Sequence, residues 1–228
     1  MTDTRRLDPV LEPLRSSLAL MLWEAEAIKV RLEEPFQLAS GNYSPIYVNC
    51  RQVISDPAFM GLAAAVARVL CVRRALRFDA VAGGETAGIP YAAYIAQALD
   101  RSMLYVRKKP KGHGIATQVE GSLRSGSRVL LVEDLITDGG SKDSFIAALR
   151  AAGATVTDAL VLFDRVQGGG AALASQQVRL HALTDRESAL AAAVASERLE
   201  AAAAEAVSEY FRNPEAWHER RGLSYRSG

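Results

Sequence analysis

Cysteine and histidine are scarce in this chain of 228 residues, which holds two cysteines and three histidines. Cys50 and Cys71 lack the spacing of a metal site, and they fit a reducing compartment better than a disulfide scaffold. His113, His181 and His218 are scattered and form no metal-ligating motif. We therefore expect a cytoplasmic protein without a metal site built from its own side chains.

Long apolar runs and an excess of charge of one sign are also missing. No run reaches the length of a membrane-spanning helix, and the N-terminus has no apolar signal core. The formal net charge is +1 and the basic residues form no stripe, so we expect neither membrane nor nucleic acid as a partner. With 49% apolar residues, the chain can build one α/β domain with an appendage.

The most informative stretch is an apolar run that ends in two acids. Val129–Val132 is short and wholly apolar, as is typical of a strand covered on both faces. Glu133 and Asp134 follow directly, and Thr137–Ser141 then forms a segment of small residues. An amphipathic helix is predicted behind that segment.

This order of elements suits a sugar phosphate. Glycines expose backbone N–H groups to an anion, and the N-terminus of the next helix adds donors and the positive end of a dipole. The carboxylates of Glu133 and Asp134 would repel a phosphate but accept hydrogen bonds from sugar hydroxyls, so a ribose 5-phosphate meets both demands. The alternative is an ordinary strand, turn and helix capped by Thr137 or Ser141, although paired acids beside a buried strand are costly without a partner.

The segment Val129–Ser141 resembles the phosphoribosyl pyrophosphate (PRPP) motif of the type I phosphoribosyltransferases, in which two acids close an apolar strand before a Thr/Gly/Ser loop. The resemblance implies a parallel α/β sheet with helices on both faces, a small N-terminal hood and a C-terminal helix. Asp138 departs from the family's usual Ala or Thr, but its backbone can still donate to phosphate. The implied PRPP contacts in this motif are Glu133, Asp134, Leu135, Ile136, Thr137, Asp138, Gly139, Gly140 and Ser141.

The segment Gln37–Asn49 contains a turn cluster followed by a predicted strand, Ile46–Asn49. It is similar to the hood of the orotate phosphoribosyltransferase branch, where the matching strand positions, Tyr47 and Val48, line the base pocket. Ala39 stands where many members carry Lys, which removes one PRPP contact. The alternative for this segment is a plain β-hairpin.

A second glycine-bearing segment follows the predicted strand Phe78–Ala82. Gly83 and Gly84 are expected to form a turn before a helix from about Ile89 to Leu99. The chain has neither GxGxxG nor GxxxxGK, which argues against dinucleotide and P-loop sites. In the family, this turn is the pyrophosphate loop, although a double glycine alone is a weak signal.

A basic segment, Arg107–Gly114, has no apolar periodicity and continues to Glu120 with little to anchor it. Such a loop can close over a polyphosphate, since Arg binds phosphate bidentately and Lys binds it as a point charge. The alternative is a solvated run of charge. The pattern Arg-Lys-x-x-Lys-x-His is similar to the catalytic loop of orotate phosphoribosyltransferases, which acts across a homodimer interface. It matches Arg107, Lys108, Lys111 and His113.

Asp164 and Arg165 end another predicted strand, Thr155–Phe163. Ligands gather beyond the carboxyl ends of parallel strands, so Arg165 is placed to meet a substrate. In the family, the matching Arg holds the orotate carboxylate, and Thr137 also contacts the base. The alternative is a surface ion pair between Arg165 and Asp164.

We expect one domain in three parts: a hood with an N-terminal helix (about 1–55), a core (about 56–183) and a C-terminal helical extension (about 184–228). The first helix is predicted from Pro9 to about Ile28, and another begins at Asp56-Pro57. In the extension, Thr184–Glu187 reads as a capping box. It opens one long Ala-rich helix that stops at Asn213-Pro214, and no site is visible there.

The implied reaction transfers the 5-phosphoribosyl group of PRPP to orotate in pyrimidine biosynthesis, giving orotidine 5′-monophosphate and pyrophosphate. Mg²⁺ is expected to be held mainly by PRPP oxygens and water. Lys111 and His113 would act on the pyrophosphate, by charge or by proton transfer. Two alternatives stay open: a phosphoribosyltransferase for a purine base, and a non-catalytic sensor of PRPP or nucleotides with the same fold.

Overall fold

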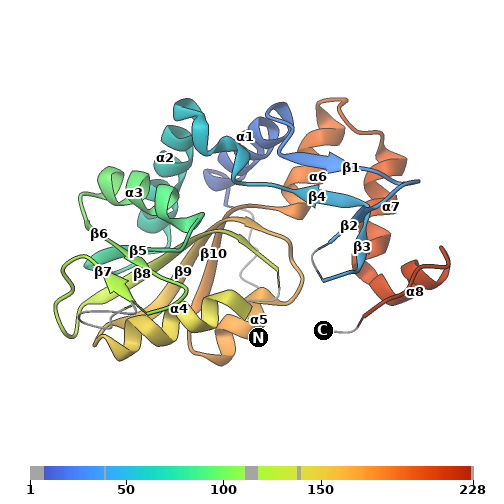
Figure 1. The fold of residues 1–228 in the computed structure, drawn as a ribbon. Coiled ribbons are helices and arrows are strands. Elements are labelled where there is room, and N and C mark those ends of the chain that lie inside the picture. The colour runs from blue at the N-terminus through green and yellow to red at the C-terminus, as the bar shows by residue number, and fades with distance from the viewer. Residues whose placement is uncertain (1–7, 39, 111–117, 138–139, 227–228) are drawn as a thin grey trace.

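The computed structural model describes residues 8–38, 40–110, 118–137 and 140–226. A six-stranded sheet lies at its centre in the order β10-β9-β8-β5-β6-β7, and β7 alone runs antiparallel to its neighbour (Figure 1). This confirms the predicted parallel α/β sheet. Its strands are β5 (Ala80–Gly84), β6 (Ser102–Val106), β7 (Val119–Glu120), β8 (Arg128–Ile136), β9 (Thr155–Asp164) and β10 (Arg179–Asp185).

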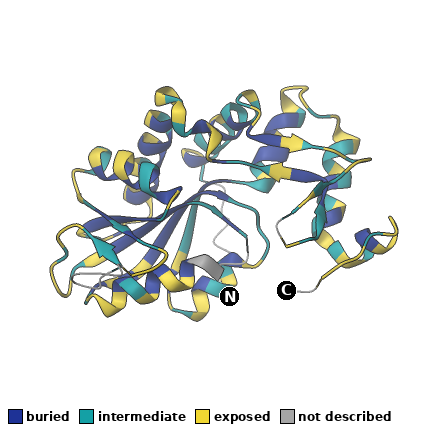
Figure 2. Ribbon diagram, in the orientation of Figure 1, coloured by how far each residue is buried: buried dark blue, intermediate teal, exposed yellow. Residues whose placement is uncertain are grey.

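The central strands are apolar throughout because helices cover both faces of the sheet. Leu130 and Val132 pack into one core with helices α1, α2 and α3, whereas Val129 and Leu131 pack into a second core with α4 and α5. Figures 1 and 2 show these two layers and the buried strands between them. The helices are α1 (Leu11–Glu24), α2 (Pro57–Arg73), α3 (Gly88–Leu99), α4 (Gly140–Ala151) and α5 (Gly169–Ser175).

The helix predicted to begin at Asp56-Pro57 does begin there. The Asp56 side chain caps α2 by accepting from the backbone N–H groups of Ala58 at 2.9 Å and Phe59 at 3.3 Å, and Pro57 takes the first helical position. Gly153, just past α4, has a φ of +90°, which suits glycine.

The hood consists of two short antiparallel pairs, β1 with β4 and β2 with β3, followed by a 3-10 helix at Gln52–Ser55. The predicted extension of the first helix to Ile28 is wrong. That helix ends at Glu24, Glu26 turns the chain with a φ of +53°, and Ile28 pairs with Val48. The strands are β1 (Ile28–Val30), β2 (Phe36–Gln37), β3 (Tyr43–Ser44) and β4 (Ile46–Val48).

The prediction of one long C-terminal helix is also wrong. The chain forms α6 (Arg186–Ala195), α7 (Ala201–Arg212) and α8 (Pro214–Glu219), and Glu197, with a φ of +58°, lies in the break between the first two. Thr184 is not the cap, because it is a buried residue of β10. Asp185 caps α6 instead, accepting from the N–H of Ser188 at 2.8 Å.

The C-terminal helices pack against the hood (Figure 1). His218 is buried, and its Nε2 accepts from the N–H of Tyr43 at 3.0 Å. Asn42 forms two hydrogen bonds with the backbone of Arg226, at 2.9 and 2.8 Å. The first and third of the three predicted parts therefore contact each other. No helix in the described ranges is long and apolar enough to cross a membrane.

Candidate active site

The predicted site residues from β8 and β9 meet at the carboxyl edge of the sheet. Ile136 pairs with Asp164, and its carbonyl accepts from the N–H of Arg165 at 3.1 Å. The carbonyl of Thr137 accepts from the N–H of Gly169 at 2.9 Å. The segment after the two acids and the segment holding Arg165 are thus fastened together by backbone bonds.

Glu133 forms a buried ion pair with Lys142, a residue that the sequence did not single out. The strand does not end at Val132 as predicted; β8 continues through both acids to Ile136. Glu133 is 6% exposed and Lys142 8%, with 3.3 Å between Nζ and Oε2. Burial raises the pKa of Glu133 to about 7, against the opposing effect of the Lys142 charge. Its Oε1 is buried and has no hydrogen-bond partner within the described ranges.

Asp134 has a more open environment. Its Oδ2 lies 3.8 Å from Nε of Arg51, whose side chain is 65% exposed, so this pair is weak and easily displaced. The Asp134 charge also adds to burial in raising the pKa of the Cys50 thiol. With its side chain 16% exposed, against 8% for Glu133, Asp134 is the more accessible of the two carboxylates.

Gly83 and Gly84 are residues of β5 rather than a turn, so the predicted double-glycine turn is wrong. Both are buried, and a Cβ on Gly84 would lie 2.0 Å from Oε1 of Glu133. Gly84 thus lets β5 approach the acid, whereas Gly83 lets α3 pack closely on β5, because its Cβ would lie 2.7 Å from the carbonyl oxygen of Gly88. The turn itself begins at Glu85, and whether the glycines contact PRPP stays a prediction.

Glu85 fastens the start of the basic segment to the sheet edge. Its Oε2 accepts from the N–H of Lys108 at 2.7 Å. The expectation of little anchoring up to Glu120 is wrong, because β7 pairs with β6 and Arg107 and Gln118 share a backbone bond of 2.8 Å. Lys111 and His113 lie outside the described residues.

The predicted phosphate cradle is described only in part. Thr137 forms a bend after β8, and Gly140 opens α4. Asp138 and Gly139 lie outside the described residues, as does the side chain of Ser141. The order of strand, short connection and helix is confirmed, and the helix end adds its dipole at this place.

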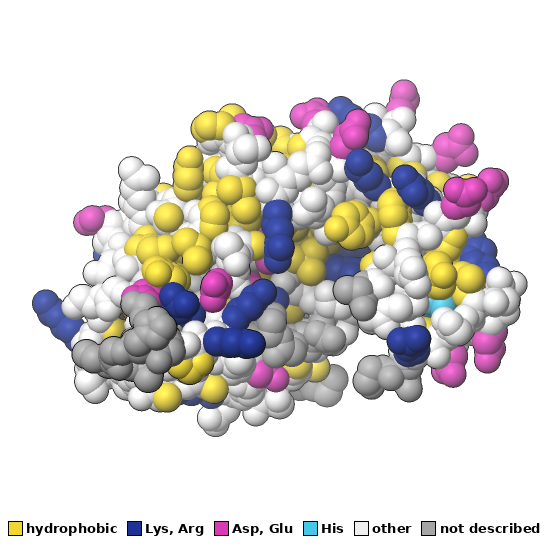
Figure 3. Space-filling view, in the orientation of Figure 1, with side chains coloured by type: hydrophobic (Ala, Val, Ile, Leu, Met, Phe, Trp, Pro, Cys, Tyr) yellow, Lys and Arg dark blue, Asp and Glu magenta, His cyan; other side chains and the backbone are white. Residues whose placement is uncertain are grey.

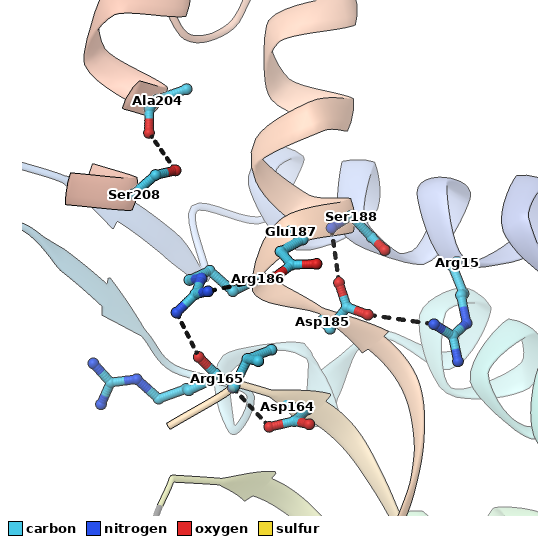
Figure 4. A network of polar contacts seen from close by, with 10 residues as sticks. Arg15, Asp164, Arg165, Asp185, Arg186, Glu187, Ser188, Ala204 and Ser208 are labelled. Carbon is cyan, nitrogen blue, oxygen red and sulfur yellow. Dashed lines mark hydrogen bonds and ion pairs between the residues drawn. The ribbon is translucent and has the colours of Figure 1, made fainter. Parts of the chain in front are cut away.

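Arg165 carries a buried guanidinium, and its Nε and one terminal nitrogen have no hydrogen-bond partner in the described part of the chain. The alternative of an ion pair with Asp164 is excluded. Asp164 accepts from the N–H of Val166 at 2.7 Å, and Figure 4 shows the Arg165 side chain pointing away from it. Burial lowers the pKa of Arg165. A buried, unsatisfied cation is costly, so this position calls for an anion.

The hood residues give a mixed result. Tyr47 is 43% exposed, with its ring 5.5 Å from that of Phe36, and Val48 is half-buried in β4. Ser44, just before them, is fully buried and hydrogen-bonded to Ile46. Ala39 lies outside the described residues. Contact of Tyr47 and Val48 with a base stays a prediction.

Charged side chains of both signs gather near the middle of the face in Figure 3. The described ranges contain no group of three His, Cys, Asp or Glu residues that could hold a metal ion.

Comparisons with known proteins place these features in context. Residues 62–178 match the model of the phosphoribosyl transferase domain. A protein of Rhizobium rhizogenes named orotate phosphoribosyltransferase is 43% identical over 209 residues, covering 90% of each chain. The crystal structure of orotate phosphoribosyltransferase from Aeropyrum pernix is 36% identical with a TM-score of 0.68, covering 76% of this chain and 96% of that one. The Mycobacterium tuberculosis enzyme in complex with PRPP is 26% identical with a TM-score of 0.63, covering 78% and 99%.

Proposed function

The chain belongs to the phosphoribosyl transferase family, in its orotate phosphoribosyltransferase branch, and we propose that it transfers the 5-phosphoribosyl group of PRPP to orotate. The products are orotidine 5′-monophosphate and pyrophosphate. The observation that carries the choice of base is the buried guanidinium of Arg165. Two of its nitrogens have no partner in the described part of the chain, which suits the carboxylate of orotate. A purine base has no carboxylate to offer there.

PRPP is proposed to lie along the ends of β5 and β8. Asp134 and Glu133 accept hydrogen bonds from the ribose hydroxyls, and their negative charge favours the positive charge that develops on the ring as pyrophosphate leaves. The segment Thr137–Ser141 and the N-terminus of α4 hold the 5′-phosphate. Gly83, Gly84 and the turn at Glu85 face the pyrophosphate end.

The leaving pyrophosphate gains negative charge, which the basic segment is proposed to stabilise. Glu85 holds the backbone of Lys108 at the sheet edge. The Lys108 charge lowers the pKa of Glu133, against the effect of burial, which supports a place for Lys108 near the site. Arg107, Lys111 and His113 complete the positive set. Arg165 orients orotate so that its ring nitrogen faces the anomeric carbon, and this proximity speeds the attack of the nitrogen on that carbon.

Mg²⁺ is proposed as the cofactor, because PRPP supplies most of its ligands and Mg²⁺ usually retains waters. Asp134 is the accessible carboxylate that fits such an arrangement, since Glu133 already pairs with Lys142. Bound Mg²⁺ would neutralise charge on the departing pyrophosphate.

A homodimer in the cytoplasm is proposed as the working form. The family's pattern has the segment Arg107–Glu120 acting across the dimer interface, with Lys108, Lys111 and His113 reaching the partner's site. The antiparallel pairing of β6 and β7 gives this segment a fixed base on its own subunit.

The test is the loss of orotate absorbance when PRPP and Mg²⁺ are added to the purified protein. Adenine, hypoxanthine and uracil serve as competing bases. Turnover of orotate without competition from the purines supports the proposal. No loss of orotate, or transfer to a purine at the higher rate, would refute it.

A further inference from the structure

Three side chains from the C-terminal helices surround Arg165, and the proposed reaction has not used them. They are Arg186 of α6 and Tyr210 and Phe211 of α7. All three lie beyond residues 62–178, the part that matches the phosphoribosyl transferase domain. No pattern in the sequence connects this extension with the site.

Arg186 holds the backbone next to the substrate-facing guanidinium. Its NH1 donates to the carbonyl of Arg165 at 3.2 Å, as drawn in Figure 4, and its guanidinium carbon lies 4.1 Å from the centre of the Phe211 ring. The side chain is 12% exposed and also pairs with Glu187 at 3.6 Å. Its charge therefore has a partner of its own, whereas two nitrogens of Arg165 have no hydrogen-bond partner among the residues that the structure describes.

Phe211 connects the two arginines. Its ring centre lies 6.0 Å from the guanidinium carbon of Arg165, at the outer limit of a cation–π contact, and much closer to Arg186. An aromatic ring attracts a cation without neutralising it. The ring can thus help to hold Arg165 in place while its charge stays uncompensated.

Tyr210 joins α7 to the hood. It is buried, which raises the pKa of its hydroxyl, while a hydrogen bond to Ser44 and the charge of Arg165 act in the opposite direction. The Ser44 hydroxyl also donates to the carbonyl of Ile46 at 2.8 Å, within the hood. Tyr210 thereby touches the base-side hood and the environment of Arg165.

We propose that Arg186, Tyr210 and Phe211 are positioning residues that aim Arg165 at the carboxylate of the base and so determine selection of a carboxylated pyrimidine. This rests on the proposed function. A long arginine side chain loses much rotamer freedom when it binds a ligand. If the neighbouring side chains already hold Arg165 in one conformation, this entropic cost is not incurred on binding. The C-terminal extension is then part of the specificity pocket rather than packing alone.

The test compares the binding of orotidine 5′-monophosphate with that of uridine 5′-monophosphate, which lacks only the carboxyl group. Phe211→Leu removes the ring and keeps an apolar side chain, and Phe211→Tyr keeps the ring as the matched control. We expect Phe211→Leu to weaken the binding of orotidine 5′-monophosphate about tenfold and to leave the binding of uridine 5′-monophosphate unchanged. Phe211→Tyr should bind both nucleotides as wild type does. Equal weakening of both nucleotides, or none, would overturn the proposal.

A double variant shows whether the ring acts through Arg165. In an Arg165→Gln background, Phe211→Leu should cause no further loss of affinity for orotidine 5′-monophosphate. A further tenfold loss of affinity would contradict the proposal. If Phe211→Leu does not fold, Tyr210→Phe is the second variant, because it removes only a hydroxyl. It should weaken the binding of orotidine 5′-monophosphate about fivefold. Unchanged binding in this variant would count against the positioning role. A wild-type protein that binds both nucleotides equally refutes the proposed function itself.

Discussion

Lys142 and Glu133 form an ion pair in the interior, with 3.3 Å between Nζ and Oε2 and less than a tenth of either residue exposed. The pair joins the first turn of α4 to β8, and so connects the proposed phosphate cradle with the proposed ribose site. Removing one partner of a buried pair leaves an uncompensated charge, which destabilises strongly.

Lys142→Met should shift the pH dependence of activity. The pKa of Glu133 is about 7, and the carboxylate form is the one that accepts from ribose, so kcat/KM should rise as pH increases through about 7. Without the Lys142 charge the rise should move up by about one pH unit or more. Lys142→Arg is the control and should stay near wild type. A rise that stays near pH 7 in Lys142→Met would contradict this account.

Stability should also depend on pH through the same acid. Because the pKa of Glu133 is raised from 4.5 to about 7 on folding, the unfolded state releases this proton first. Its contribution to stability is therefore present below about pH 4.5, falls between 4.5 and 7, and is constant above. Compared with a Glu133→Gln/Lys142→Met double variant, wild type should lose about 3 kcal/mol between pH 4.5 and 8 in denaturant unfolding. If the difference in unfolding free energy between the two proteins is the same at pH 4.5 and pH 8, the raised pKa of Glu133 is refuted.

Gly84→Ala should damage the site, because its Cβ would lie 2.0 Å from Oε1 of Glu133 and 2.6 Å from the Phe145 ring. We expect a loss of about 2 kcal/mol or more in unfolding free energy, together with weaker PRPP binding. Gly61→Ala in α2 is the matched control, since its Cβ meets nothing within 4 Å. That variant should gain about 0.5–1 kcal/mol, as expected of a helical glycine. Equal behaviour of the two variants would show that the close approach is irrelevant.

Arg165→Gln should raise the orotate KM about tenfold or more, because it removes a charged hydrogen-bonding pair. The KM for PRPP should change little. Steady-state kinetics with each substrate varied in turn separates the two. An effect confined to PRPP would remove Arg165 from the base site.

Mixed dimers should recover activity if the basic segment acts on the partner's site. Lys111→Ala and Asp134→Ala each disable a different half of the proposed site, so a heterodimer retains one intact combination. Activity should return to about a quarter to a half of wild type in purified heterodimers, as one site of two is restored. Heterodimers as inactive as either parent would place Lys111 in its own subunit's site.

Local patterns predicted much of the sheet edge. The apolar run into Glu133 and Asp134, the cap at Asp56 and the position of Arg165 at a strand end all follow from neighbouring residues or from a general rule of parallel sheets. These features depend on short stretches of chain, which is why the sequence alone indicated them.

Contacts between distant segments escaped prediction. Lys142 looked like an ordinary helix residue until folding placed it against Glu133, and Phe211 lies 46 positions from the arginine whose guanidinium it faces. The break at Glu197 was missed because alanines favour helix on both sides of it. Such features arise from tertiary packing, which overrides local propensity.

The most direct measurement is a crystal structure of the protein with orotidine 5′-monophosphate bound. We expect the phosphate at Thr137–Ser141, the ribose hydroxyls at Asp134 and Glu133, and the carboxylate on the guanidinium of Arg165. A nucleotide bound elsewhere, or one whose carboxylate faces solvent while Arg165 stays unpaired, would contradict this expectation.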